Sequence, residues 1–396
     1  MPIPFVWHNK SFFEQRYPVL NKLNWTQSLR CFRSFHFFVL SLTIFNQNLL
    51  FMGLVRYVFL TLLSISLFPS CKEKPKEPVS VPEGVSKNEA QKIKVIFDTD
   101  ANNELDDQHA MAYMLFNGDV FDIRGITVNA TYNGGGIQGH YDEAERVLQL
   151  SNLKDSIPLL KGANGNFDEI SDSFDPYNYD GQEGVDFILE ETKKDSTIIV
   201  AVGKLTNIAL ALKKDPSFAE RTKIVWLGSN YPEPGEYNQD NDTISMNYVL
   251  NSKIPFEMVT VRYGKPSGTD AVAVTQTEVN SRMPGLGPKA KTPITGRHGG
   301  TFGNFGDYSI SLFEHIHYHT DPPSRPLFDM VALAILKDSS WGEQKSIPAP
   351  VLINNKWIER PQNDREITVW ENFDKEKVLA DFYETMENPT LVSATQ

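Results

Sequence analysis

The sequence predicts an α/β protein with a mostly parallel, doubly wound central sheet flanked by helices. The first observation is an apolar run at residues 94–97, which is followed by a helix-like stretch at residues 107–116. The second is that the same order returns along the chain, with further apolar runs in FDIRGITVNA, SIPLLKG, STIIVAVG, KIVWLGS and IPFEMVTV. Strands that alternate with helices are typical of parallel sheets. Ligands of such sheets bind beyond the carboxyl ends of the strands, so polar residues at those ends are the first site candidates.

The chain of 396 residues is long enough to bury a sizeable core. It divides into three predicted parts: an N-terminal extension with a signal peptide at residues 1–70, a flexible tether at 71–91, and one folded domain at 92–396. Within the domain, residues 264–308 are rich in Gly, Pro and Thr, and helical patterns resume at residues 308–319 and 328–336. We interpret residues 264–308 as a long insert.

Residues 52–71, MGLVRYVFLTLLSISLFPSC, resemble a bacterial lipoprotein signal peptide. Basic Arg56 precedes an apolar run at residues 58–68, and small Ser70 precedes Cys71. The run is shorter than the about 20 residues that a spanning helix needs, and lipidation enzymes recognise a small residue before Cys. We therefore expect a lipid anchor at Cys71 and a domain in the envelope of a bacterium, facing the periplasm or the outer surface. An uncleaved anchor helix and a plain secretory signal are the alternatives.

Charge and cysteine content exclude several classes of function. Residues 1–70 hold six of the 38 Lys and Arg but one of the 50 Asp and Glu, so the remainder carries a formal net charge of −17. This acidic balance argues against nucleic acid as a partner. No cysteine follows Cys71, so the domain has neither a disulfide nor a thiolate metal site.

The strongest signal of chemistry is the segment FDTDANNELDDQHA, at the end of the first apolar run. It places four carboxylates within ten residues: Asp98, Asp100, Asp106 and Asp107. Because unpaired charges at this density repel one another, the segment predicts a bound cation. Ligation by oxygen alone in an irregular loop suits calcium better than magnesium, which requires an octahedron. The alternative is a solvated acidic loop.

Two other motifs that begin with Asp-x-Asp match less well. An EF-hand loop requires Gly at its sixth position and Glu at its twelfth, where this chain has Asn103 and His109. A phosphatase of the haloacid dehalogenase type expects Thr or Val where this chain has Asn102. The EF-hand interpretation fails, and the phosphatase, which would require magnesium, stays a minor alternative.

The ordered set of motifs resembles the inosine-uridine-preferring nucleoside hydrolase family. The fingerprint of that family is an Asp-x-Asp followed shortly by a paired Asp-Asp after the first strand. Further matches are GKLTNIALAL, KIVWLGS, SMNYVL and PLFDMVALAIL, which follow the family's order from residue 92 to about residue 336. The resemblance implies a nucleoside-hydrolase-like fold. It also implies hydrolysis of the N-glycosidic bond of nucleosides or related ribosides, with calcium as the cofactor.

The resemblance implies roles for individual residues as well. Asp100 would remove a proton from the water that attacks C1′, while calcium and the carboxylates orient that water. Asp98 would help to build the loop. The implied ribose-binding residues are Asp106, Asn247 and Asp329. The implied calcium ligands are the carboxylates of Asp100, Asp107 and Asp329 and the backbone carbonyl of Thr206.

The chain departs from the family in two places that bear on catalysis. Five residues separate Asp100 from Asp106 where the family has three, so new side chains are candidates to enter the site: Asn102, Asn103 and Glu104. Phe328 precedes Asp329 where the family usually has a His that aids departure of the base. A leaving-group acid is therefore missing from its expected place.

Other polar residues have no firm role in the sequence. Asp180 stands where the family has a His, and Ser245 stands where it has a Glu that binds the 5′-hydroxyl. Asn129 or Asn133 is either a site residue or a turn former, and Trp226 is more typical of a core strand. Several histidines are candidates for the missing acid, although each is more typical of a surface or core-edge position: His109, His298, His315, His317 and His319.

The leading prediction is a calcium-dependent nucleoside or riboside hydrolase that is anchored in the cell envelope through Cys71. The main alternative is a lipoprotein that binds a ribosyl ligand through calcium and turns it over slowly or not at all, and the missing His and Glu of the family favour this alternative. A homo-oligomer is compatible with the sequence. The sequence leaves open the leaving group and whether residues 264–308 cover the site.

Overall fold

The computed structural model describes residues 91–318 and 320–393. The signal peptide, the lipid anchor at Cys71 and almost all of the tether lie outside the described residues. Within the described ranges, no helix combines the length and the apolar character that crossing a bilayer requires. The organisation of the N-terminal segments therefore stays a prediction.

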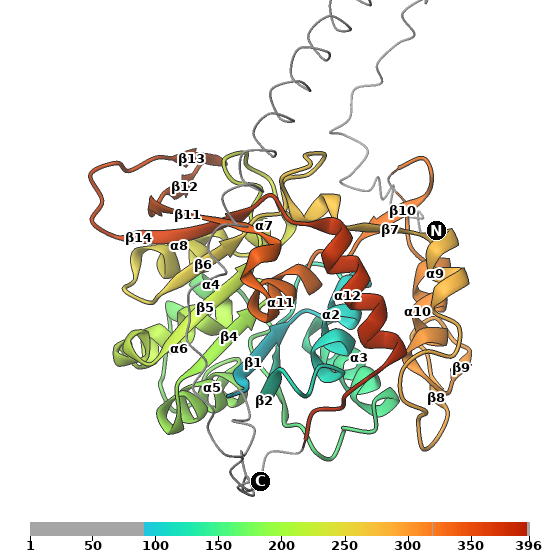
Figure 1. The fold of residues 1–396 in the computed structure, drawn as a ribbon. Helices are drawn as coiled ribbons and strands as arrows, with labels where there is room; N and C mark the ends of the chain where they lie inside the picture. Colours follow the sequence, from blue (N-terminus) through green and yellow to red (C-terminus); the bar gives the residue numbers. More distant parts are fainter. Residues whose placement is uncertain (1–90, 319, 394–396) are drawn as a thin grey trace, which may run out of the picture. The chain divides into compact units, whose positions relative to one another are not determined.

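An eight-stranded sheet forms the centre of the domain (Figure 1), with strand order β11-β14-β6-β5-β4-β1-β2-β3. All neighbouring strands pair in parallel except β11 with β14. The strands are β1 (Ile93–Thr99), β2 (Phe121–Val128), β3 (Leu159–Lys161), β4 (Thr197–Ala201), β5 (Thr222–Leu227), β6 (Phe256–Val259), β11 (Glu343–Pro348) and β14 (Glu366–Glu371). The mostly parallel sheet confirms the predicted fold class. The strand order reverses at β1, which places a topological switch point beside its carboxyl end.

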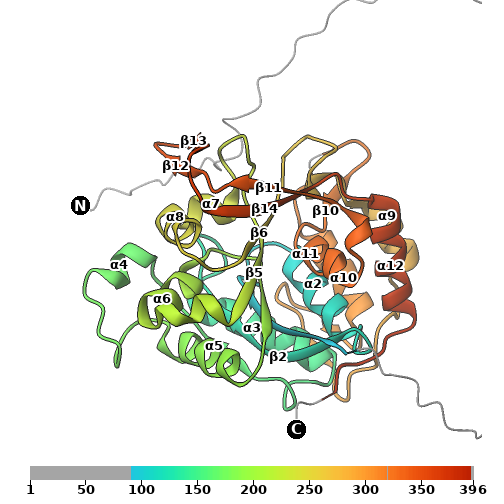
Figure 2. The same ribbon diagram turned by 60° about the vertical axis from the view of Figure 1, so that its left-hand side comes forward.

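Helices cover both faces of the sheet (Figure 2). The central strand β1 is accordingly apolar on both sides, since each side packs against helices. Val95 and Phe97 belong to one buried cluster, and Ile96, between them, belongs to the other. The first cluster includes residues of α2 (Asp106–Leu115), α3 (Gly136–Leu150), α10 (Phe305–Glu314), α11 (Met330–Lys337) and α12 (Lys375–Glu387). The second includes residues of α4 (Phe167–Ser171), α5 (Gln182–Lys194), α6 (Thr206–Lys214) and α8 (Thr243–Asn251).

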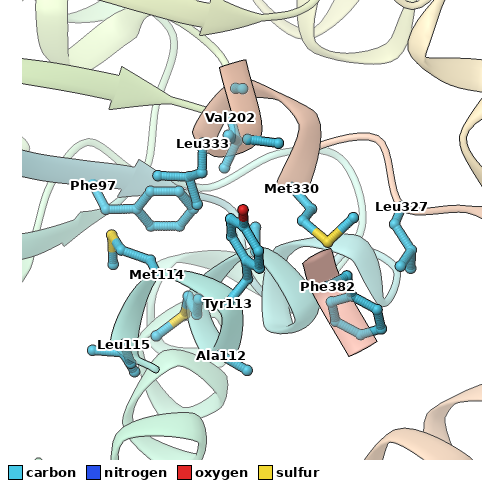
Figure 3. Packing of buried hydrophobic residues seen from close by; sticks show 14 of the residues in the cluster. Phe97, Ala112, Tyr113, Met114, Leu115, Val202, Leu327, Met330, Leu333 and Phe382 are labelled. Atoms are coloured by element: carbon cyan, nitrogen blue, oxygen red, sulfur yellow. The ribbon is translucent and has the colours of Figure 1, made fainter. Parts of the chain in front are cut away.

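Helix α2 is buried along its whole length, which fixes the acidic residues at its start. Figure 3 shows Tyr113 and Met114 of α2 against Phe97 of β1, with Met330 and Leu333 of α11 close by. All five side chains are fully buried. Complete burial of one such side chain is worth about 1.5–3 kcal/mol. The amino ends of α2 and α11 are therefore held rigidly beside the carboxyl end of β1.

The predicted insert is folded. It contains β7 (Ala273–Thr275), α9 (Gln276–Arg282) and a hairpin of β8 (Ile294–Thr295) and β9 (Thr301–Phe302), and β7 pairs antiparallel with β10 (Ser324–Pro326). Helix α10 ends at Glu314, so the helical pattern expected to reach residue 319 stops before His315. The remaining elements are α7 (Tyr237–Asn241), a hairpin of β12 (Val351–Ile353) and β13 (Lys356–Ile358), and short 3₁₀ turns at Pro216–Glu220, Thr269–Ala271 and Ser339–Trp341.

Candidate active site

Three buried carboxylates meet where two helices begin beside the end of β1. Asp106 and Asp107 are the first two residues of α2, and Asp329 directly precedes α11. Each offers a carboxylate oxygen, and these oxygens all lie within 4.8 Å of one another. The exposed fractions of the three residues are 8%, 2% and 2%. We call these three residues the acidic triad.

Asp100 faces the acidic triad from the loop that follows β1. Its side chain is buried, and Oδ2 accepts a 2.6 Å hydrogen bond from the Thr131 hydroxyl. Burial, together with the nearby charge of Asp106, raises the pKa of Asp100 to about 7, although the hydrogen bond from Thr131 lowers it. Asp100 in turn raises the pKa values of Asp107 and Asp329. The structure thus brings together four of the acidic residues that the sequence singled out.

The acidic triad has the chemistry of a cation site. Burial raises the pKa of Asp106 to about 6, and burial with the neighbouring carboxylates raises those of Asp107 and Asp329 well above their usual value. Buried like charges are costly unless a cation offsets them. All the side-chain donors are oxygens, which suits a hard cation. The residues present therefore fit a divalent metal ion, and Asp106, expected to hold ribose, also lies among the candidate ligands.

Asp98 supports the site from within β1. Its carboxylate accepts hydrogen bonds from the Thr127 hydroxyl at 2.6 Å and from the side-chain amides of Asn129 and Asn207, each at 2.7 Å. Burial raises the pKa of Asp98 to about 6, although these donors lower it. Asp98 therefore ties together the ends of β1 and β2 and the start of α6.

Thr206 is the first residue of α6 and is fully buried. Its hydroxyl donates a 2.6 Å hydrogen bond to Asp242. Asp242 also accepts from the backbone N–H of Phe167 at 2.7 Å and from that of Ser245 at 2.9 Å. This network fixes the amino end of α6 at the edge of the sheet where the acids lie. The metal-binding role of the Thr206 carbonyl stays a prediction.

Asn247 lies on α8 and is engaged elsewhere. Its amide nitrogen donates to the Leu352 carbonyl at 2.8 Å, and its oxygen accepts from the Leu352 N–H at 3.0 Å. Both ends of the side chain are thus committed to β12, and the structure gives Asn247 no described contact with the acidic triad. Its ribose-binding role stays a prediction, which this geometry does not support.

Glu236 is a candidate site residue that the sequence motifs did not indicate. It is 3% exposed and accepts hydrogen bonds from the backbone N–H groups of Ser229, Asn238 and Gln239. Burial raises its pKa to about 7, and its charge raises the pKa values of Asp100 and Asp329. Glu236 lies in the segment after β5, which contains KIVWL. A polar residue that follows a predicted parallel strand is a site candidate, and this position is the only feature of the sequence that pointed to Glu236. Ser245, by contrast, donates to the Asp242 carbonyl within α8.

None of the described contacts of the candidate histidines joins one of them to the acidic triad. His109 is buried in α2, where Nε2 lies 2.7 Å from the Ser309 hydroxyl, and burial lowers its pKa to about 4. His298 and His315 stack on each other with ring centres 4.5 Å apart. Among the remaining candidates, His317 belongs to the segment after α10, and His319 lies outside the described residues. Phe328 packs edge-on against Tyr263, so its position holds no acid.

The expanded loop between Asp100 and Asp106 is anchored to its neighbours. The backbone N–H of Asn102 donates to Nδ1 of His140 at 3.2 Å, and its side-chain amide donates to the Gly134 carbonyl at 2.8 Å. Glu104 forms an ion pair with Arg325 of β10. A side chain on Gly134 would collide with the His140 ring, which explains the glycine there. Asn102 and Glu104 therefore connect the acidic loop to the loop after β2 and to β10, which pairs with β7 of the insert.

Fold and site together define a hydrolase that acts on N-glycosyl compounds. The model of the inosine-uridine preferring nucleoside hydrolase family matches residues 95–380, and the chain belongs to this family. No curated protein matches the chain in a sequence search. The family assignment therefore rests on the family model, with the acids of the site in the expected order along the chain.

Solved nucleoside hydrolases share the fold at low sequence identity. A plant nucleoside hydrolase superposes with a TM-score of 0.60 at 17% identity, covering 76% of this chain and 100% of its own. An inosine-guanosine nucleoside hydrolase gives 0.57 at 17% identity, covering 74% and 98%. A purine-preferring ribonucleoside hydrolase from Gardnerella vaginalis gives 0.54 at 19% identity, covering 74% and 98%.

Proposed function

We propose that this protein hydrolyses the N-glycosidic bond of nucleosides or related ribosides with the help of calcium. The observation that carries the proposal is the buried acidic triad with Asp100 beside it. A family of nucleoside hydrolases supports the reaction class. Calcium is proposed because the donors are all oxygens in an irregular loop, where a flexible coordination shell is an advantage over an octahedron.

Asp100 is the proposed general base. A base works best when its pKa is close to the working pH, and burial places the pKa of Asp100 at about 7. The hydrogen bond from Thr131 fixes the direction in which its carboxylate points. Asp100 would take a proton from the water that attacks C1′ while the C1′–N bond breaks, and the sugar would pass through an oxocarbenium-like state that nearby carboxylates stabilise.

The acidic triad and Glu236 are the proposed ribose-holding groups. Asp106 and Asp329 would accept hydrogen bonds from ring hydroxyls, and Asp100, Asp107, Asp329 and the Thr206 carbonyl would ligate the cation. Calcium, when bound, would offset the repulsion of the carboxylates and orient the hydroxyls and the water. Three backbone N–H groups fix the carboxylate of Glu236, and we propose that it binds a further hydroxyl of the sugar. In the family, a Glu at the position of Ser245 binds the 5′-hydroxyl, and Glu236 would take over this role.

A second function is kept because of Phe328. This residue is 7% exposed and packs on Tyr263 where the family usually has an acid for the departing base. A site that binds ribosyl ligands through calcium but turns them over slowly would have this composition. The envelope location and the anchor at Cys71 are part of both proposals.

Ribose release from a panel of purine and pyrimidine nucleosides separates the two functions. The purified protein is assayed with calcium and after chelation, alongside ligand-induced shifts of the melting temperature. Release that chelation abolishes supports the hydrolase. Calcium-dependent thermal shifts without release support the receptor, and the absence of both would contradict a ribonucleoside ligand.

A further inference from the structure

The hairpin of β8 and β9 presents an arginine to the acidic site. Arg297 lies between the two strands, and its Nη1 is 3.3 Å from Oδ1 of Asn102, two residues after Asp100. The charges of Asp106 and Asp107 act on Arg297 through space. The insert therefore brings a cation to the side of the site where the expanded acidic loop lies.

Arg297 is held by neutral groups. Its Nε donates a 2.9 Å hydrogen bond to Nε2 of His298, and its other described side-chain partner is the amide of Asn102. Two other arginines of this region, Arg146 and Arg325, pair with the carboxylates of Glu143 and Glu104. Arg297 forms no ion pair with any described residue, so its positive charge stays available to a ligand.

The hairpin is braced so that the guanidinium has a defined position. Arg146 of α3 donates from Nε to the Thr295 carbonyl at 2.8 Å. His298 stacks almost parallel on His315, with an angle of 8° between the rings, and Nδ1 of His315 lies 2.7 Å from the Ser311 carbonyl. The turn itself closes through a 3.0 Å bond from the Gly299 N–H to the Gly296 carbonyl. A side chain of α3 and the ring of His315, which directly follows α10, thus both fix the loop that carries Arg297.

We propose that Arg297 stabilises the departing base during hydrolysis. In the family, a His at the position of Phe328 usually aids departure of the base, and the apolar ring of Phe328 cannot do so. This inference rests on the proposed function. As the water oxygen bonds to C1′, the electron pair of the C1′–N bond passes to the base nitrogen, and Asp100 takes a proton of the water. The guanidinium donates hydrogen bonds to the negative charge that develops on the base. The base then takes a proton from solvent, so ribose and neutral base are the products.

A guanidinium suits this role as an electrostatic donor and not as an acid. Its pKa is too high for proton loss, whereas its planar fork presents several N–H donors. Removal of one donor aimed at a developing anion typically costs about 10²–10³ in kcat. A good leaving group, such as 4-nitrophenolate, needs no such help. The proposal therefore predicts a loss that depends on the leaving group.

The test compares inosine with 4-nitrophenyl β-D-riboside, with calcium present. Arg297→Gln is expected to lower kcat on inosine roughly 100-fold and to leave 4-nitrophenyl riboside turnover close to that of the unchanged protein. Arg297→Lys, which keeps the charge, should recover part of the loss. Arg282→Gln, which removes a surface guanidinium of α9, is the matched control and should change neither rate.

The outcomes separate this proposal from the proposed function. An equal loss on both substrates would show that Arg297 only supports the fold and would overturn the proposal. Restoration of inosine turnover in Arg297→Ala by added guanidinium would support it, since a purely structural role does not respond to the free cation. If the unchanged protein hydrolyses inosine with calcium, the proposed function stands whatever the Arg297 variants do. If it hydrolyses neither substrate, the proposed function fails, and the leaving-group role fails with it.

Discussion

The Thr131 hydroxyl donates a 2.6 Å hydrogen bond to the Asp100 carboxylate and so joins the loop after β2 to the loop after β1. Thr131 lowers the pKa of Asp100 against the effect of burial. Thr131→Val removes the donor, so the pKa of Asp100 should rise and the acid limb of the pH–rate profile should move to higher pH. A hydrogen bond to a charged group is worth about 1.5–3 kcal/mol, which corresponds to roughly one to two pH units. Thr131→Ser is the control that keeps the hydroxyl, and identical profiles for the Val variant and the unchanged protein would contradict this relationship.

Asp100→Ala should abolish turnover. General bases contribute about 10²–10⁴-fold to the rate, and no other described carboxylate has the position of Asp100 beside the acidic triad. Calcium binding, measured by titration calorimetry, should be weakened and not lost, because Asp106, Asp107 and Asp329 remain. Unchanged ribose release would remove Asp100 from its role as base.

Calcium binding should release protons and should weaken as the pH falls. The pKa values of Asp100 and Asp106 lie at about 7 and 6 in the folded protein, so these groups take up protons as the pH falls through that range and compete with the cation. The increase in melting temperature caused by calcium should therefore be large at pH 8 and small near pH 5.5. Calorimetry in two buffers of different ionisation enthalpy would detect the released protons, and a pH-independent affinity would contradict a carboxylate site.

The pH dependence of stability without calcium follows from the same shifts. A carboxyl group with a raised pKa binds its proton more tightly in the folded than in the unfolded state. Its contribution to the free energy of unfolding is therefore fully present below the unfolded pKa of about 4 and is lost as pH rises through the folded value. For Asp98, Asp100 and Glu236 the loss falls between pH 4 and about 7. Asp98→Asn should reduce this dependence while lowering overall stability, because an amide cannot accept all three hydrogen bonds.

Glu236 and Asn247 should respond differently to substitution. Glu236→Gln should raise KM for nucleosides, because its carboxylate belongs to the site, with a smaller effect on kcat. Asn247→Ala should lower the melting temperature and leave KM unchanged, because it breaks two hydrogen bonds to Leu352. A rise of KM in Asn247→Ala without loss of stability would restore the ribose-binding role expected from the sequence.

Cys71→Ser should abolish incorporation of labelled fatty acid and release the protein from the membrane fraction. The expectation follows from the small residue and cysteine that end the apolar run at residues 58–68. A protein that stays membrane-bound and unlabelled would indicate an uncleaved anchor helix. Release of both the Ser variant and the unchanged protein into the medium would indicate a plain secretory signal.

The sequence by itself determined the fold class, the family and the acids of the site that lie close together along the chain. Alternation of apolar runs with helical patterns is a local property, and it predicted the parallel sheet that is observed. Four of these acids lie within ten residues of the chain: Asp98 near the end of β1, Asp100 in the loop that follows, and Asp106 and Asp107 at the start of α2. Their mutual proximity therefore follows from chain connectivity.

Only the tertiary structure showed how distant residues meet these acids. Asp329, which the family resemblance had implied, lies beside Asp106 and Asp107 because α11 packs against the buried α2. Arg297 contacts Asn102 because of the way the insert folds, and no sequence pattern indicated this contact. The charge of Glu236 acts on Asp100 and Asp329, while Asn247 pairs with β12. Such placements depend on packing between elements far apart in the sequence, which local patterns of residues do not encode.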